Sequence, residues 1–525
     1  MEELTDQTSI PTTGVTAEEG KRHFARNVLS SIAFFAFNAG TSLYFVPYQI
    51  RNLGMVNYGM VTLAQSFPGY LQVVTVVIIG AVGRFVTFEV ARKNHDGARA
   101  YVNTQMIALV WLLAVLTPVC ALFSYFAPSI LRIPQGQAGN VQALIFLVLA
   151  SSLLTLPIGV LRVSTFIRQR FDFNRYLDGL DQAFRYSTWV SLFTLMAPAL
   201  WHIGTGYMVG TVVSLVGSWI LFRKLTPELK IRLHGFDGRK FREMTRMSGW
   251  QTIGQIGVML YLSLDVLIIN RMIGPEAVGK YGTVMGLSLM LRGLAAMIGL
   301  MMGPMAIAYH ARRDYVSMCR ASARAVKFQS LVMAIPLGIM CGLSVPFIAW
   351  WLGPKLVLLH VLVWLMLAHL VWNLGITPLY GIATAMNKIA IPGIATIIGG
   401  LAHVGLAITL VKYTNLGIYG VAISSGISLT VKNLIFTPIY SGRIMGTSSW
   451  PLFKALAPSV IWFAVAAAAG LGAAKFLLLD SFLKLLGTGA ALFVVCAVLS
   501  YFLTIGRQDR QFASQLVFRN RRRES

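Results

Sequence analysis

Two short stretches, RNLGMVNYG at 51–59 and RMIGPEAVGK at 271–280, reveal how this chain is organised. They share an arginine and two glycines, each of which recurs 220 positions later: Arg51 as Arg271, Gly54 as Gly274 and Gly59 as Gly279. The same shift carries further residues along without a gap: Gly83 onto Gly303, and Ala91-Arg92-Lys93 onto Ala311-Arg312-Arg313. Self-similarity at so long a spacing indicates a duplicated domain, because solenoid units recur about every 20 to 50 residues.

The composition indicates that both copies lie in a membrane. Of the 525 residues, 56% are hydrophobic and only 12% are charged, and the mean hydropathy of +0.68 excludes a soluble globule. The net charge is +25, but the basic residues stand at the ends of apolar runs, so no nucleic-acid partner is expected. The four cysteines lack disulfide or metal-ligand spacing. An apolar chain with two repeats is typical of secondary transporters, whose substrate site lies where the repeats meet.

Apolar runs of about 20 residues, the length that crosses about 30 Å of hydrocarbon as a helix, follow one another along nearly the whole chain. We predict an all-α polytopic membrane protein with about 14 transmembrane helices, made of two parallel six-helix repeats and two extra C-terminal helices. The predicted spans cover residues 27–49, 58–82, 103–126, 141–162, 181–201, 203–222, 249–272, 281–307, 329–352, 357–386, 389–411, 417–440, 453–475 and 482–505.

Lysine and arginine predict the orientation, because short loops rich in these residues stay on the cytoplasmic side. Basic loops such as 84–99 alternate with loops that carry few positive charges, so both termini are expected in the cytoplasm. The repeats then share one orientation, related by an axis along the membrane normal. The predicted segments are a disordered cytoplasmic tail at 1–20, an N-lobe of six spans at 21–222, a basic cytoplasmic linker at 223–246, a C-lobe of six spans at 247–443, two further spans within 450–505 and a basic cytoplasmic tail at 506–525.

Motifs at the start of each repeat carry a resemblance. They are Arg51-Asn52-Leu53-Gly54, Tyr58-Gly59 and Gly80-Ala81-Val82-Gly83-Arg84 in the first repeat, and Asp265, Ile268-Ile269-Asn270-Arg271-Met272-Ile273-Gly274 and Val278-Gly279-Lys280-Tyr281 in the second. This combination resembles the polysaccharide-transport branch of the multidrug/oligosaccharidyl-lipid/polysaccharide exporter superfamily, and is similar to O-antigen flippases. The resemblance implies an alternating-access flippase with two lobes forming a V. Its implied role is to move a polyprenyl diphosphate-linked oligosaccharide across the bacterial cytoplasmic (inner) membrane for polysaccharide biosynthesis. Membrane lipids, and glycosyltransferases or a polymerase of the same pathway, are the other partners it implies.

Two cations inside apolar runs are candidates for binding the diphosphate of such a substrate. Arg292 lies about eleven residues into the eighth run, roughly 16 Å deep, and Lys432 lies about fifteen residues into the twelfth run. Exposing a cation to lipid at the midplane would cost at least about 2.5 to 3.5 kcal/mol. We therefore expect Arg292 to face protein or water. The alternative is that Arg292 forms a structural ion pair that holds helices together.

Three further charged residues are candidates near or inside the membrane. Arg84 and Arg162 stand where the second and fourth runs reach the cytoplasmic interface, so they either collect the diphosphate or act as topology signals bound to anionic headgroups. Asp265 is the sole carboxylate well inside a run. Because an unpaired buried carboxylate tends to protonate, Asp265 is either salt-bridged or a coupling-ion site. Gln72 stands at the position equivalent to Arg292, so the candidate charges are not duplicated.

Two other functions are compatible with the sequence. One is a cation-coupled multidrug exporter of the same superfamily, and the other is an integral-membrane polysaccharide polymerase or ligase. An exporter of organic cations would favour acidic pockets, whereas the buried charges here are mainly basic. A polymerase or ligase would need a sizeable non-cytoplasmic loop, and the loops predicted on that face are only a few residues long. We therefore predict a transporter rather than an enzyme, with no cofactor and no metal site.

Overall fold

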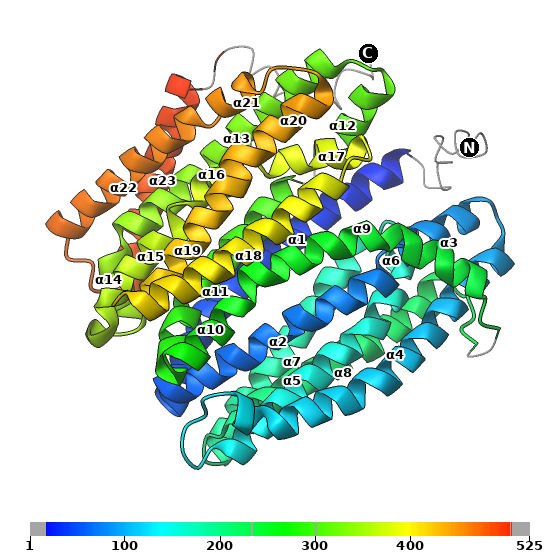
Figure 1. The fold of residues 1–525 in the computed structure, drawn as a ribbon, viewed down its shortest axis with the longest axis horizontal. Helices are drawn as coiled ribbons and strands as arrows, with labels where there is room; N and C mark the ends of the chain where they lie inside the picture. The colour runs from blue at the N-terminus through cyan, green and yellow to red at the C-terminus, as the bar shows by residue number, and fades with distance from the viewer. Residues whose placement is uncertain (1–16, 233–234, 300–301, 505, 507–525) are drawn as a thin grey trace. The chain divides into compact units, whose positions relative to one another are not determined.

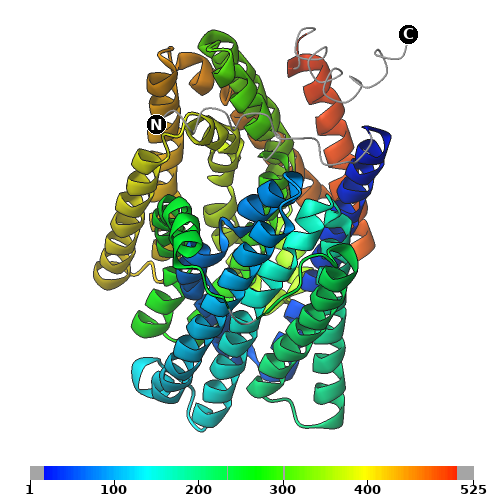
Figure 2. The same ribbon diagram turned by 90° about the vertical axis from the view of Figure 1, so that its right-hand side faces the viewer.

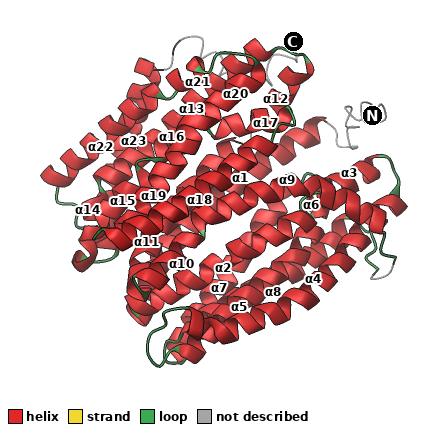
Figure 3. Cartoon of the chain, viewed as in Figure 1, coloured by secondary structure: helices red, strands yellow, loops and turns green. Residues whose placement is uncertain are grey.

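A computed structural model describes residues 17–232, 235–299, 302–504 and 506 (Figure 1). All regular structure in these ranges is helical, as predicted (Figure 3). The described helices include eleven that are long and apolar enough to cross a membrane. The other three predicted spans fall on α2, α7 and α11, which have 25 residues each. The total of fourteen therefore stays a prediction. Most of the predicted tails, 1–20 and 506–525, lies outside the described residues.

The chain divides into two compact units, Met1–Lys280 and Tyr281–Ser525. The first unit contains ten helices among its described residues: α1 (Ala17–Leu53), α2 (Met55–Ile79), α3 (Val82–Ala91), α4 (His95–Ile130), α5 (Ala138–Leu161), α6 (Val163–Ile167), α7 (Phe171–Leu195), α8 (Leu200–Leu225), α9 (Gly238–Leu262) and α10 (Leu264–Met272). Within it, α8 packs against both α5 and α7, and α2 packs against α9. Helix α11 (Pro275–Gly299) begins in the first unit and continues in the second.

The second unit is also a bundle of helices that run side by side (Figure 2). Its elements are α12 (Met302–Ala311), α13 (Tyr315–Gly342), α14 (Ser344–Trp351), the 3₁₀ helix η2 (Pro354–Leu359), α15 (His360–Leu367), α16 (Leu370–Gly375), the 3₁₀ helix η3 (Thr377–Leu379), α17 (Tyr380–Ala385), α18 (Ala390–Tyr413), α19 (Ile418–Thr430), the π-helix η4 (Val431–Phe436), α20 (Thr437–Met445), α21 (Trp450–Lys454), α22 (Ala457–Phe476) and α23 (Phe482–Thr504). A buried cluster that includes Val326, Ile376 and Leu452 lies between α13, the α16–α17 region and α21. Helix α18 lies beside α19, and α13 packs along α22.

The helix bounds follow the same repeat as the sequence. Helices α2 and α11 begin one repeat length apart, α3 and α12 end one repeat length apart, and α4 and α13 begin at equivalent positions. The caps repeat as well, because Asn94 and Asp314 each accept a hydrogen bond from the backbone amide three residues later, at 3.0 Å. Lys93 and Arg313, one residue before these caps, both have positive φ, at 61° and 55°. The two repeats therefore share backbone conformation as well as sequence motifs.

The duplicated glycines Gly59 and Gly279 lie against each other within the first unit. A Cβ atom on Gly59 would overlap the carbonyl oxygen of Pro275, and one on Gly279 would overlap the carbonyl oxygen of Met55. Met55 and Pro275 occupy equivalent positions of the two repeats, so the contact is reciprocal. Any larger side chain at either glycine would force the starts of α2 and α11 apart. This close backbone approach explains why both repeats carry glycine at this position.

Candidate functional site

Lys432 lies in a π-helical turn within a membrane span. The span runs from Ile418 to Met445 and passes from α19 through the π-helix η4 into α20. At the end of η4 the amide of Thr437 donates to the carbonyl of Lys432, five residues earlier. The physical reason is Pro438, because proline has no amide to donate and its ring would clash with the carbonyl four residues earlier in an α-helix. A π turn inside an α-helical span is frequent at functional sites.

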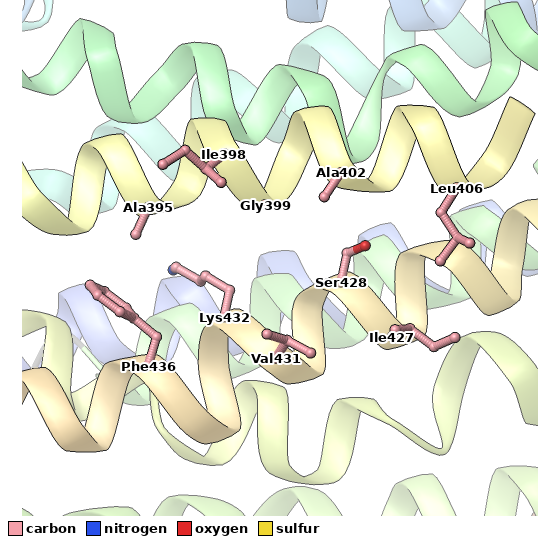
Figure 4. Close-up of a pocket in the computed structure, with 10 residues that line it drawn as sticks. All are labelled: Ala395, Ile398, Gly399, Ala402, Leu406, Ile427, Ser428, Val431, Lys432 and Phe436. Carbon is pink, nitrogen blue, oxygen red and sulfur yellow. The ribbon is translucent and has the colours of Figure 1, made fainter.

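A cavity of about 610 Å³ lies beside Lys432, between α18 and the α19–η4 segment. In Figure 4, Ala395, Ala402 and Leu406 of α18 point toward the other wall, and Ser428, Lys432 and Phe436 point from that wall toward α18. The lining residues are Ala395, Ile398, Gly399, Ala402 and Leu406 from α18, and Ile427, Ser428, Val431, Lys432 and Phe436 from the other wall. Apart from Ser428 and Lys432, the lining is apolar, and none of these ten residues is acidic. The cavity can therefore accommodate an apolar group with an anion at one place in its wall.

The Lys432 amine is held by an aromatic residue. Its Nζ donates a hydrogen bond to the hydroxyl of Tyr380 at 3.3 Å and lies 4.6 Å from the centroid of the Tyr380 ring. The Tyr380 hydroxyl donates in turn to Oδ1 of the buried Asn433, at 2.9 Å. These contacts orient the amine by a cation–π interaction and a hydrogen bond. They do not neutralise its charge.

Arg292 is placed beside a polar network in the second unit. Its Nε donates to Ser288 Oγ on the same helix at 3.3 Å, and its charge acts on the buried imidazole of His369. The amide of Asn373 lies 2.8 Å from the His369 Nδ1 atom and 3.4 Å from the Thr430 hydroxyl. Thr430 is the residue directly before η4. The hydrogen-bonded network of His369, Asn373 and Thr430 thus ends two residues before Lys432 in the chain.

Arg162 has an acidic partner. Its Nη2 lies 2.8 Å from an Asp178 carboxylate oxygen and 3.1 Å from Ser214 Oγ, and its side chain is only 24% exposed. Arg175 also pairs with Asp178, at 3.2 Å. This arrangement ties the end of α5 to α7 and α8, which favours a structural role for Arg162.

Arg84 and Asp265 occupy different surroundings. Arg84 lies on α3, and its described contact is a long one of 3.9 Å to the sulfur of Met247. Asp265 is buried in α10, 4% exposed, and acts electrostatically on Tyr70, whose hydroxyl donates to the Ser263 carbonyl at 2.8 Å. The structure therefore brings Lys432 and Arg292 into one unit and leaves Arg84, Arg162 and Asp265 in the other.

Tyr380 and Asn433 were not predicted as neighbours of Lys432. Pro438, six residues after Lys432, is the signal that could have located the wide turn. The partner Tyr380 comes from a separate helix, so no spacing in the sequence indicates it.

Comparisons with known proteins decide the family. Residues 24–306 match the family model described as "Polysaccharide biosynthesis protein". The chain belongs to this family. It is also 29% identical over 489 residues to the uncharacterized membrane protein EpsK of Bacillus subtilis strain 168, a match that covers 93% of this chain and 97% of that protein. The resemblance to the polysaccharide-transport branch of the exporter superfamily is confirmed.

Two solved structures show that the fold of this family member is shared with transporters. The lipid II flippase MurJ, in an inward closed conformation, matches with a TM-score of 0.64 and 14% identity over 90% of this chain and 99% of that chain. An inward-facing multidrug resistance MATE family transporter of the MOP superfamily matches with a TM-score of 0.57 and 14% identity, over 77% and 98% of the two chains. The chain thus belongs to the polysaccharide biosynthesis family and has the fold that these two transporters share.

Proposed function

We propose that this protein is a flippase that moves a polyprenyl diphosphate-linked oligosaccharide across the bacterial cytoplasmic membrane by alternating access, with both termini in the cytoplasm. The family and the fold support a transporter that serves polysaccharide biosynthesis. The observation that carries the substrate class is Lys432, whose amine borders an apolar cavity without an acidic residue in its lining.

Lys432 lies in the middle part of the candidate membrane span Ile418–Met445. A cation there costs at least about 2.5 to 3.5 kcal/mol unless it is compensated. Tyr380 compensates Lys432 only in part, because a phenol and a ring face are weaker partners than a carboxylate. A diphosphate would complete the compensation while it crosses. The apolar, non-acidic lining also disfavours an exporter of organic cations.

Arg292 and Lys432 have the complementary chemistry that this substrate requires. The planar guanidinium of Arg292 can bind two phosphate oxygens at once, whereas the ammonium of Lys432 acts as a point charge. Arg84 is proposed to collect the diphosphate at the cytoplasmic interface. Arg162, the other candidate for that role, contributes mainly through its pair with Asp178. Asp265 is retained as the candidate for a coupling ion.

The decisive experiment measures polysaccharide export and protein abundance in cells that carry only an Arg292 variant. We expect Arg292→Ala to abolish export and Arg292→Lys to retain part of it, with near-normal abundance of both. Full export by Arg292→Ala at normal abundance would remove Arg292 from the mechanism. Low abundance of both variants would identify Arg292 as a structural ion-pair residue instead.

The proposed orientation has its own test. Reporter fusions after Lys355 and after Arg443 should report opposite sides of the membrane. If both reported the same side, the arrangement of two parallel six-helix repeats would be wrong.

A further inference from the structure

The cavity beside Lys432 has room because one face of α18 carries small residues. Ala395, Gly399 and Ala402 follow one another at helical spacings of four and three residues and face the other wall (Figure 4). Its volume of about 610 Å³ lies within the roughly 300 to 1,000 Å³ of typical ligand sites. The cavity is therefore large enough to hold a segment of an apolar molecule.

The cavity is also open to the surface of the second unit. Among its lining residues, Ile398 is 62% exposed, Val431 is 53% exposed and Ile427 is 49% exposed. All three side chains are apolar and β-branched. A long apolar molecule can thus occupy the cavity with one segment while the rest of it extends beyond the opening.

The depth of Lys432 decides which apolar molecule fits. Lys432 lies at the middle of its span, which runs for 28 residues from Ile418 to Met445. At about 1.5 Å per residue, each end is roughly 20 Å away. The phosphate of a bilayer phospholipid stays in the headgroup region, outside the hydrocarbon core, so it does not reach the amine. A phosphate that meets Lys432 belongs to a lipid whose headgroup crosses the membrane.

We propose that this cavity binds the phosphate-proximal isoprene units of the substrate's polyprenyl chain while the phosphate contacts Lys432. This inference rests on the proposed function and adds to it a binding site for the lipid carrier. The apolar lining matches the hydrocarbon of the isoprene units, and the amine at its edge matches the anion to which they are joined. Together these two contacts keep the first isoprene units of the polyprenyl chain next to Lys432.

The test uses purified full-length protein in nanodiscs of zwitterionic lipid, with a long-chain polyprenyl monophosphate as the probe. Ala402→Leu fills part of the cavity without changing the charge. Ala114→Leu makes the same change at an exposed position of α4 and is the matched control. We expect Ala402→Leu to weaken polyprenyl phosphate binding roughly tenfold, because the added side chain and the isoprene units would compete for the same space. Ala114→Leu should bind as the wild type does.

Two further measurements show which kind of lipid the cavity binds. Lys432→Gln should also weaken binding of the probe, and phosphatidylglycerol at the same concentration should not displace it. Displacement by phosphatidylglycerol would show a general anionic-lipid site and overturn the inference.

The outcomes separate the inference from the proposed function. If the wild type binds the probe and Ala402→Leu binds it equally well, the cavity is not the chain site, and the proposed function stands. If the wild type does not bind the probe at all, both the inference and the proposed function fail.

Discussion

Helices α7 and α18, one from each repeat, carry different kinds of side chain. In the first unit, α7 carries Asp178, which pairs with Arg162 and Arg175 at 2.8 and 3.2 Å. Helix α18, about one repeat length after α7, instead contributes Ala395 and Ile398 to the apolar lining of the cavity in the second unit. One helix thus forms ion pairs, and the other borders a cavity.

The cation shows the same contrast. Lys432 and Pro438 lie in the span Ile418–Met445, about one repeat length after α8. Helix α8 is regular from Leu200 to Leu225, whereas the equivalent span contains η4. A duplicated helix pair can therefore serve as a rigid support in one repeat and as a candidate binding site in the other. Charge pairing distinguishes the two roles.

Removing the cation should have the largest effect on transport. We expect Lys432→Ala to lower the rate of export about a hundredfold, because loss of one partner of a desolvated charge contact costs about 2 to 5 kcal/mol. Lys432→Arg should keep part of the activity, since it keeps the charge. The measurement is export per molecule, normalised by membrane abundance. Unchanged export in Lys432→Ala would mean that the contrast between the two spans has no functional meaning.

Removing the proline just after η4 should have the next largest effect. Pro438→Ser removes the cause of the π turn, so η4 should become α-helical and rotate Lys432 away from its present direction. We expect export to fall about tenfold at normal abundance, because a misplaced binding group loses much of its effect. The labelling rate of Lys432→Cys by a thiol reagent, with and without Pro438→Ser, reports the rotation. Equal labelling rates would show that Pro438 does not determine the turn.

Removing only the phenol hydroxyl should have a small effect. Tyr380→Phe keeps the ring near the amine but removes the hydroxyl that Lys432 and Asn433 share. We expect export to fall about two- to fivefold, since a single hydrogen bond contributes about 0.5 to 1.5 kcal/mol. Tyr380→Ala, which also removes the cation–π contact, is the comparison and should lose more. Equal activity of the two variants would exclude the ring as a partner of Lys432.

The paired arginine should affect stability rather than transport. We expect Arg162→Gln to lower the thermal stability of the purified protein by a few degrees while export per folded molecule stays unchanged, because it leaves a half-buried carboxylate short of one partner. The double variant Arg162→Gln with Asp178→Asn should recover part of the stability. Loss of export per molecule in the single variant would indicate that Arg162 contacts the substrate.

Several features of this protein follow from the sequence alone. The composition determined the membrane class, and the recurrence of one set of motifs in each half predicted a duplication that the starts of α2 and α11 follow. The sequence also predicts a depth for Arg292 and Lys432, because depth along a transmembrane helix grows by a constant rise per residue. These properties are local or periodic, so the linear sequence is enough to predict them.

The tertiary structure alone decided which charges are compensated. Arg162 and Lys432 are both cations in apolar runs, yet one meets Asp178 from α7 and the other meets Tyr380 from α17. The cavity likewise needs the small residues of α18 and the wide turn of η4 to face each other. Partners and hollows of this kind depend on how helices pack side by side. No spacing within a single helix specifies that packing, so the sequence could indicate these cations but could not assign their roles.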